Sequence, residues 1–171
     1  MPEVQARVNS HGGEAAKVPI QVNTALNQIR SIAAGSDDRV EKARRLADCI
    51  RKLGDYHWVG IFDVGAKQVS LLTFSGPGVT EVPTFPVSKG ITGTAIKQKQ
   101  TIIVGDVRKD QRYVTAFAST VSEMIVPVVD PSGRVVGTVD VESPQADAFG
   151  PSDQQMVEQC AQAALPLWLL R

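Results

Sequence analysis

The segment EMIVPVV-DPSG-RVVGTVDVE (residues 123–142) decides the fold. Apolar residues follow a period of two over 123–129 and again over 134–142, as expected for strands that bury one face. The intervening DPSG has proline at its second position and glycine at its fourth, which is typical of a β-turn. The segment therefore predicts a β-hairpin of two antiparallel strands.

The period of two continues on the N-terminal side of this hairpin. Four more strands are predicted there, at 56–63, 68–74, 81–87 and 101–104. Helices are predicted at 18–34, 37–53, 90–99 and, ahead of the helix-breaking Pro166, at 152–165. This order predicts an α+β domain: a central antiparallel sheet of five to six strands, with the N- and C-terminal helices packed on one face.

Length indicates one domain, since 171 residues can bury one sizeable core but not two. Residues 1–18 have no apolar period and are expected to form a flexible tail, which leaves 19–171 as the domain. Four residues are expected to be buried where the second and last helices cover the sheet: Leu46, Ile50, Val157 and Cys160.

Charge and hydropathy exclude several classes of partner. Eighteen basic and eighteen acidic residues cancel, so no long-range field favours nucleic acid or an anionic membrane. No apolar run is long enough to span a bilayer, and the N-terminus lacks a signal-peptide pattern. We therefore expect a cytoplasmic protein that binds neither nucleic acid nor a membrane.

Cysteine and histidine are scarce. Cys49 and Cys160 fall in apolar helical patterns, which favours free thiols over a disulfide. His11 and His57 have no partners at metal-ligand spacing, so no metal site is expected.

The glycine-containing stretch SKGITGTA (88–95) is not a phosphate-binding loop. Its lysine precedes the first glycine, which is the wrong order for a Walker A loop. The dinucleotide fingerprint also fails, since there is no GxG and no parallel βαβ unit. Two interpretations remain: a sharp glycine turn without a ligand, or backbone N–H groups that line the mouth of a pocket.

Acidic residues recur on one face of the hairpin, where Asp140 and Glu142 alternate with apolar residues. They are either on a solvent-exposed strand face or part of a pocket. A two-residue loop would place Glu123 opposite Asp140, so that three carboxylates gather. A bulge at Gly133 would instead shift the register by one residue and turn Glu123 to the other face.

Three carboxylates in one patch would need a nearby cation, either Lys or Arg or the ammonium group of a ligand. Trp58 and Phe62 share one face of the first predicted strand with Gly60. Their rings would suit a cationic ligand as an aromatic wall.

These residues give the chain a resemblance to the GAF domain, a PAS-related fold, and within that superfamily to the free methionine-(R)-sulfoxide reductases. The resemblance is carried by HWVGIF (57–62), FPVSKGITGTA (85–95), SEMIVPVV (122–129), GTVDVESP (137–144) and FGPSDQQMVE (149–158), and it covers about 110 residues. It implies that SKGITGTA is a pocket wall. It also implies a site for an amino-acid-like ligand formed by Trp58, Phe62, Thr92, Ala116, Ser122, Glu123, Ile125, Asp140 and Glu142.

The chain departs from that family where the family carries redox cysteines, because Val82, Thr92 and Ala116 occupy the matching positions. Sulfoxide reduction by these enzymes needs an attacking thiolate and a resolving thiol. A threonine hydroxyl is neither ionised nor a soft nucleophile near neutral pH. The same gap argues against a covalently attached bilin, and no cofactor is expected.

Three hypotheses follow. The first is a non-catalytic sensor domain whose acidic, aromatic-walled pocket binds an amino-acid-like or cationic small molecule. The second is a reductase-like enzyme with relocated chemistry. The third is a structural module with an empty pocket, which dimerises through its terminal helices and the apolar residues Leu167, Trp168 and Leu169.

Overall fold

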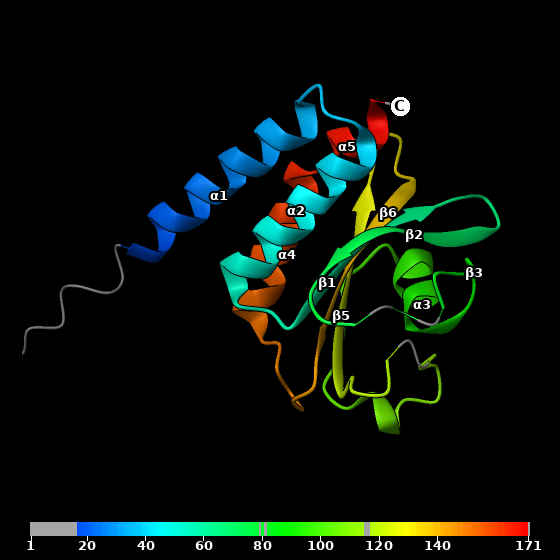
Figure 1. The fold of residues 1–171 in the computed structure, drawn as a ribbon. Coiled ribbons are helices and arrows are strands. Elements are labelled where there is room, and N and C mark those ends of the chain that lie inside the picture. Colours follow the sequence, from blue (N-terminus) through cyan, green and yellow to red (C-terminus); the bar gives the residue numbers. More distant parts are fainter. Residues whose placement is uncertain (1–16, 79, 81, 115–116, 171) are drawn as a thin grey trace, which may run out of the picture.

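The computed structural model describes residues 17–78, 80, 82–114 and 117–170, and within them the chain forms a six-stranded antiparallel sheet (Figure 1). The strands are β1 (Trp58–Val64), β2 (Gln68–Ser75), β3 (Thr84–Pro86), β4 (Ile102–Val104), β5 (Ser122–Val129) and β6 (Val135–Ser143). Their order across the sheet is β3-β2-β1-β6-β5-β4. Each run that the sequence predicted as a strand overlaps one of them.

Helices lie on both faces of the sheet. The bounds are α1 (Lys17–Ala34), α2 (Arg39–Gly54), α3 (Gly90–Gln98), α4 (Pro151–Ala163) and α5 (Pro166–Leu169), with a 3₁₀ helix η1 at Val107–Lys109. In Figure 1 the N- and C-terminal helices cover one face, while α3 lies on the other. The predicted α+β architecture is confirmed. The division into a tail at 1–18 and a domain at 19–171 stays a prediction, because residues 1–16 lie outside the described part of the chain.

The main apolar core lies between the sheet and the terminal helices. Val59 and Ile61 of β1 face this core, which also contains the four residues predicted to be buried there: Leu46, Ile50, Val157 and Cys160. Cys49 is half-buried and Cys160 is fully buried, and both thiols are free. No helix among the described residues is long and apolar enough to cross a membrane.

The C-terminal turn belongs largely to this core. Leu167 is 0% exposed and Trp168 is 4% exposed. The prediction that both are available as a dimer surface is therefore wrong. Leu169 remains exposed, together with Leu170 and Val40.

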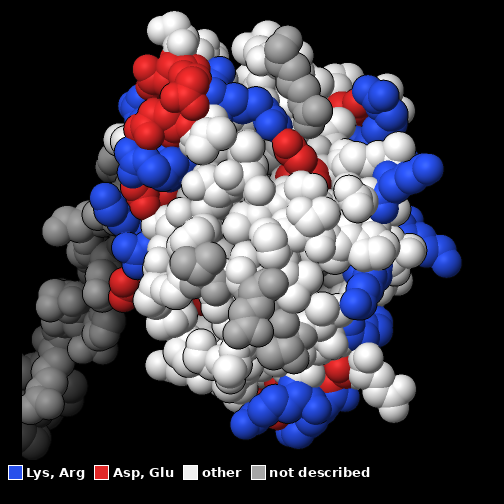
Figure 2. Space-filling model, turned by 45° about the vertical axis from the view of Figure 1, so that its right-hand side comes forward, with Lys and Arg blue, Asp and Glu red and all other residues white. Residues whose placement is uncertain are grey.

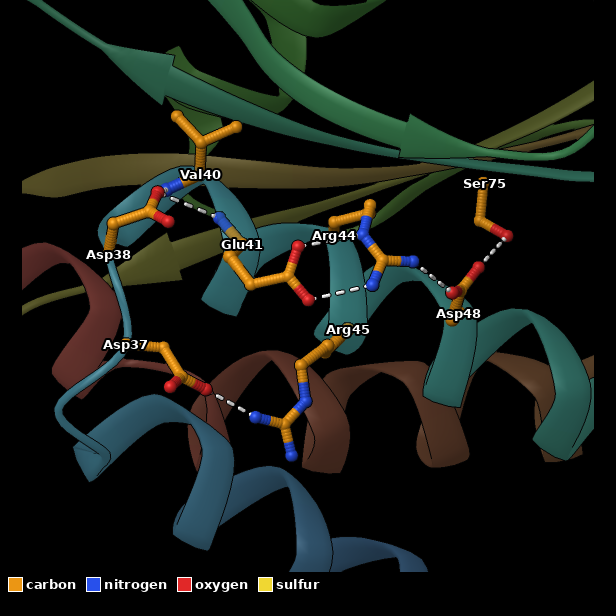
Figure 3. A network of polar contacts seen from close by, with 8 residues as sticks. All are labelled: Asp37, Asp38, Val40, Glu41, Arg44, Arg45, Asp48 and Ser75. Carbon is orange, nitrogen blue, oxygen red and sulfur yellow. Dashed lines mark hydrogen bonds and ion pairs between the residues drawn. The ribbon is translucent and has the colours of Figure 1, made fainter.

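A polar network holds α2 against β2 (Figure 3). Asp38 caps the helix by accepting hydrogen bonds from the backbone N–H groups of Val40 and Glu41. One turn further on, Arg44 bonds both Glu41 and Asp48. The buried Ser75 of β2 donates its hydroxyl proton to Asp48 and accepts a hydrogen bond from Arg51. This connection fixes the helix layer relative to the strand that neighbours β1.

The β5–β6 hairpin has neither of the two predicted registers, the one with a two-residue loop or the one with a single bulge at Gly133. Asp130 N–H donates to the Arg134 carbonyl at 2.8 Å, so the loop has three residues, and Gly133 takes a positive φ of 81°. A second shift lies between Val128 and Val129. Each irregularity moves the register by one residue, and together they restore the original face.

This double shift decides where the acids lie. Glu123 is opposite Glu142, and Ile125 is opposite Asp140. Glu123 therefore stays on the same face as the other two acids, although its partner is not the Asp140 that a two-residue loop predicted. A single slip would have turned Glu123 into the helix-covered core.

Candidate functional site

A narrow cavity lies between the sheet and α3, on the face away from the terminal helices. It is lined by Trp58, Phe62, Thr80, Val82, Phe85, Lys89, Gly90, Ile91, Thr92, Val114, Glu123, Asp140 and Glu142. The space open to the centre of a water molecule is about 40 Å³. This exceeds the roughly 10–15 Å³ that one water molecule needs, so the cavity is small but has room for a polar guest of at least that size.

Aromatic rings form one wall. Trp58 lies 6.5 Å from Phe62 between ring centroids, and Phe62 lies 6.2 Å from Phe85. Gly60 separates Trp58 and Phe62 on β1, and a Cβ there would fall 2.4 Å from the Trp58 ring and 2.7 Å from the Phe62 ring. The glycine thus leaves room for both rings over the strand. Trp58 is 2% exposed, and its Nε1–H has no hydrogen-bond partner among the described residues.

Three carboxylates line the cavity on the same sheet face as the aromatic rings, since Glu142 of β6 pairs with Trp58 of β1 and Glu123 of β5 pairs with Glu142. Glu123, Asp140 and Glu142 are 8%, 3% and 4% exposed. The Thr120 hydroxyl donates to Oε2 of Glu142, whereas Oδ1 of Asp140 has no hydrogen-bond partner in the described chain. Within that chain, none of the three forms an ion pair with Lys or Arg. These carboxylates add little to the outer surface. The side of the molecule shown in Figure 2 carries most of its charged residues near its margins.

Burial controls the ionisation of these acids. It raises the pKa of Asp140 to about 7, against the effect of the nearby Thr138 hydroxyl, and the charge of Glu142 adds to the rise. Burial also raises the pKa of Glu142 to about 7, against the hydrogen bond from Thr120. The pKa of Glu123 is raised well above its usual range by burial and then by the charges of Glu142 and Asp140. Burial and mutual repulsion therefore both favour the protonated form of these acids.

The stretch SKGITGTA forms the wall that faces the sheet. Gly90 has a φ of 79° and begins α3, so the stretch makes a sharp glycine turn and also lines the cavity. Ligand binding at this wall stays a prediction. Lys89 precedes the helix and is the one Lys or Arg among the described residues that lines the cavity. Thr92 is 6% exposed and also lines it.

The structure brings together most of the predicted site residues but not all of them. Six line the cavity: Trp58, Phe62, Thr92, Glu123, Asp140 and Glu142. Ser122 does not, because alternation along β5 turns it away from Glu123, and its hydroxyl donates to the Gln145 carbonyl at 2.7 Å. Ile125 instead packs beneath α3 against Ile91 and Ala95. Ala116 lies outside the described residues.

Several lining residues were missed by sequence reasoning. Thr80 and Val114 are outside the helices and strands, where no periodic pattern indicates which side chain faces inward. Phe85 and Lys89 could have been predicted, since both belong to the motif FPVSKGITGTA on which the family resemblance rests.

Comparison with known proteins gives the same architecture. A GAF domain model matches residues 37–165. GAF domain-containing protein A of Dictyostelium discoideum is 26% identical over 141 residues, which cover 81% of this chain and 87% of that protein. The free methionine-R-sulfoxide reductase of Saccharomyces cerevisiae is 29% identical over 109 residues, 63% of this chain and 60% of that protein.

Solved structures with the same fold are named as enzymes and as sensors. The free methionine-R-sulfoxide reductase from Neisseria meningitidis, in complex with its substrate, superposes with a TM-score of 0.77 at 24% identity, covering 93% of this chain and 94% of that chain. A putative GAF sensor protein from Burkholderia vietnamiensis gives 0.76 at 25% identity, with 86% and 93% covered. Fold likeness alone does not choose between the two functions.

Proposed function

The chain belongs to the GAF domain family, and we propose that it is a non-catalytic member that binds an amino-acid-like or cationic small molecule in the cavity beneath α3. The main support is Asp140, which is buried with an unpartnered oxygen beside two further carboxylates. Within the described chain no Lys or Arg neutralises them. An ammonium group of a ligand would supply both the missing charge and the missing hydrogen-bond donors.

The aromatic wall favours the same class of ligand. The faces of Trp58, Phe62 and Phe85 offer apolar contact and cation–π attraction to an ammonium group. A zwitterionic ligand would place its carboxylate toward Lys89. The small cavity volume favours a buried head group, with the rest of the ligand toward the mouth.

Ligand binding is tested by a thermal-shift panel of amino acids, methionine sulfoxide and cyclic nucleotides. We expect an amine-bearing compound to raise the melting temperature, because ligand at a hundredfold excess over Kd stabilises the folded state by about 2.7 kcal/mol. Asp140→Ala should weaken binding of the best compound by roughly 10- to 150-fold, which corresponds to the loss of a charge-assisted hydrogen bond worth about 1.5–3 kcal/mol.

Asp37→Ala is the matched control for this variant, because Asp37 is an exposed acid between α1 and α2. Its binding should equal that of the wild type. Equal affinity of Asp140→Ala and the wild type would place the ligand elsewhere. A panel without any shift would favour the empty structural module.

A reductase is the second candidate function, favoured by the relatives named as reductases. We expect no thiol-dependent reduction of free methionine sulfoxide above background. Val82 and Thr92 line the cavity at positions where the resembling family has redox cysteines. Burial raises the pKa of the Cys49 thiol, and it raises that of Cys160 to about 12, so neither is a ready thiolate.

The measurement is methionine formation with a dithiol reductant. Product above background would contradict the non-catalytic proposal. If that product survived Cys49→Ser and Cys160→Ser, the chemistry would have a carrier other than a native thiol.

The role in the cell stays a prediction. We propose a sensor or regulatory role in the cytoplasm and a homodimer formed through the terminal helices. The apolar residues exposed for such contact are Val40, Leu169 and Leu170 rather than Leu167 and Trp168. A solution mass measurement that gives a monomer at high concentration would remove the dimer and leave the ligand proposal intact.

A further inference from the structure

We propose that the cavity exchanges protons for the cationic group of its ligand: at neutral pH the empty cavity holds at least one proton on Glu123, Asp140 and Glu142, and an entering cation releases it. The inference concerns regulation of the same site and rests on the proposed function in one respect, that the cavity accepts a cationic group. Proton storage in the empty cavity does not depend on which ligand is natural.

The strand register brings the three carboxyl groups together. Glu123 and Glu142 are directly opposite on neighbouring strands, where Cβ atoms lie about 5 Å apart. Asp140 occupies the next position on the same face of β6. Three ionised carboxylates at this spacing, each nearly buried, would repel one another strongly while losing their hydration.

The charged groups around the acids do not remove this repulsion. Lys89, before α3, is exposed. Asp110 adds negative charge near Glu123, and its own side chain forms an ion pair with Arg112 at 2.6 Å. Thr120 supplies only a hydroxyl, to Glu142. Within the described residues no buried positive charge faces the cluster, and proton uptake is the remaining way to reduce its charge.

A second observation marks the cavity as a ligand site rather than a chance group of acids. The Nε1–H of Trp58 is buried and lacks a partner among the described residues, as does Oδ1 of Asp140. Buried polar atoms are nearly always hydrogen-bonded in native proteins. An unpartnered donor and an unpartnered acceptor on residues lining one cavity indicate that a polar guest completes them.

The carboxyl groups titrate near neutral pH, where the ammonium group of a ligand is still charged. Burial raises the pKa of Asp140 and of Glu142 to about 7, whereas an alkylammonium group keeps its proton to about pH 10. A cation therefore meets a partly protonated cluster near pH 7. If binding releases one proton, the affinity of the cavity for the cation should rise by up to about tenfold per pH unit below the titration midpoint. Above the midpoint the affinity should become constant.

The sign of this dependence identifies the group that enters. An ammonium group needs ionised carboxylates and binds better as the pH rises. A neutral oxygen acceptor needs the donor O–H of a protonated carboxyl, so it binds better as the pH falls. The proposal requires the first behaviour.

The test is a titration of the side-chain carboxyl carbons by ¹³C NMR on the full chain, with Asp140→Asn, Glu142→Gln and Glu123→Gln to assign the resonances. In the empty wild-type protein we expect at least one of the three to titrate above pH 6. Methylammonium chloride should then lower its midpoint by about one pH unit or more relative to equal sodium chloride. Exposed carboxyls should respond equally to both salts.

Three midpoints below pH 5 in the empty protein would overturn the proposal, and so would midpoints that methylammonium leaves unchanged. The two proposals fail separately. Midpoints that respond to methylammonium, combined with no hit in the ligand panel, would support proton exchange and reject the amino-acid-like ligand. A panel hit whose affinity falls as the pH rises would support ligand binding and reject proton exchange.

Discussion

Asp140→Asn is expected to make the unliganded protein more stable at pH 8. The difference in the free energy of unfolding between variant and wild type should increase by about 3 kcal/mol from pH 4.5 to pH 8. Burial raises the pKa of Asp140 from 3.8 to about 7. The wild type must therefore ionise a buried carboxyl as the pH rises, whereas the asparagine has nothing to ionise. The variant also removes a like charge from beside Glu123 and Glu142.

The sign follows from proton linkage. Between pH 3.8 and about 7 the folded state holds a proton on Asp140 that the unfolded chain has released. Raising the pH then favours the unfolded state, and the loss is complete once the pH passes the folded pKa. At pH 4.5 roughly a quarter of this penalty is present, and at pH 8 almost all of it is.

Urea denaturation of both proteins at a series of pH values measures the gap. Asp106→Asn is the matched control, because hydrogen bonds from Arg108 hold the pKa of that carboxyl below its usual range. The contribution of Asp106 is lost only at lower pH, so its gap should stay flat from pH 4.5 to pH 8. A flat gap for Asp140→Asn as well would mean that Asp140 is ionised and satisfied in the folded protein.

The sequence predicted the fold well because periodicity reports burial directly. The run at 56–63 placed Trp58 and Phe62 opposite Val59 and Ile61, and the sheet separates them in that way. The hairpin register was beyond such reasoning. A turn motif indicates a reversal, but the shift between Val128 and Val129 leaves no signal that separates it from ordinary alternation.

The site was predictable where it lies on strands and much less so where it lies on loops. Alternation along the strand predicted that Asp140 and Glu142 share one face. Placing Glu123 on that face as well required the register of the hairpin. Ser122 does not line the cavity, and alternation alone assigns it to the face of β5 opposite that of Glu123. Thr80 and Val114 enter the cavity from loops whose path depends on tertiary contacts.

Gly93→Ala is expected to destabilise the protein by about 2 kcal/mol, although alanine has a higher helix propensity than glycine. Gly93 lies inside α3, where alanine is favoured over glycine by about 1 kcal/mol. A Cβ at this position would lie 2.4 Å from the carbonyl carbon and 2.6 Å from the carbonyl oxygen of Ser88. Both are backbone atoms that no rotamer change can move, so the cost of overpacking, about 1–3 kcal/mol or more, outweighs propensity.

The same contact links this glycine to the cavity. Ser88 leads directly into Lys89 and Gly90, so pushing α3 away from Ser88 displaces the wall that faces the three acids. Affinity for the best panel ligand should fall together with the free energy of unfolding. Gly150→Ala is the control, since a Cβ there meets only Asp153 Oδ2 at 3.9 Å, and its free energy of unfolding should change by less than about 1 kcal/mol. A Gly93→Ala protein as stable as the wild type would show that α3 does not rest on the Ser88 backbone, and that SKGITGTA holds its glycines for another reason.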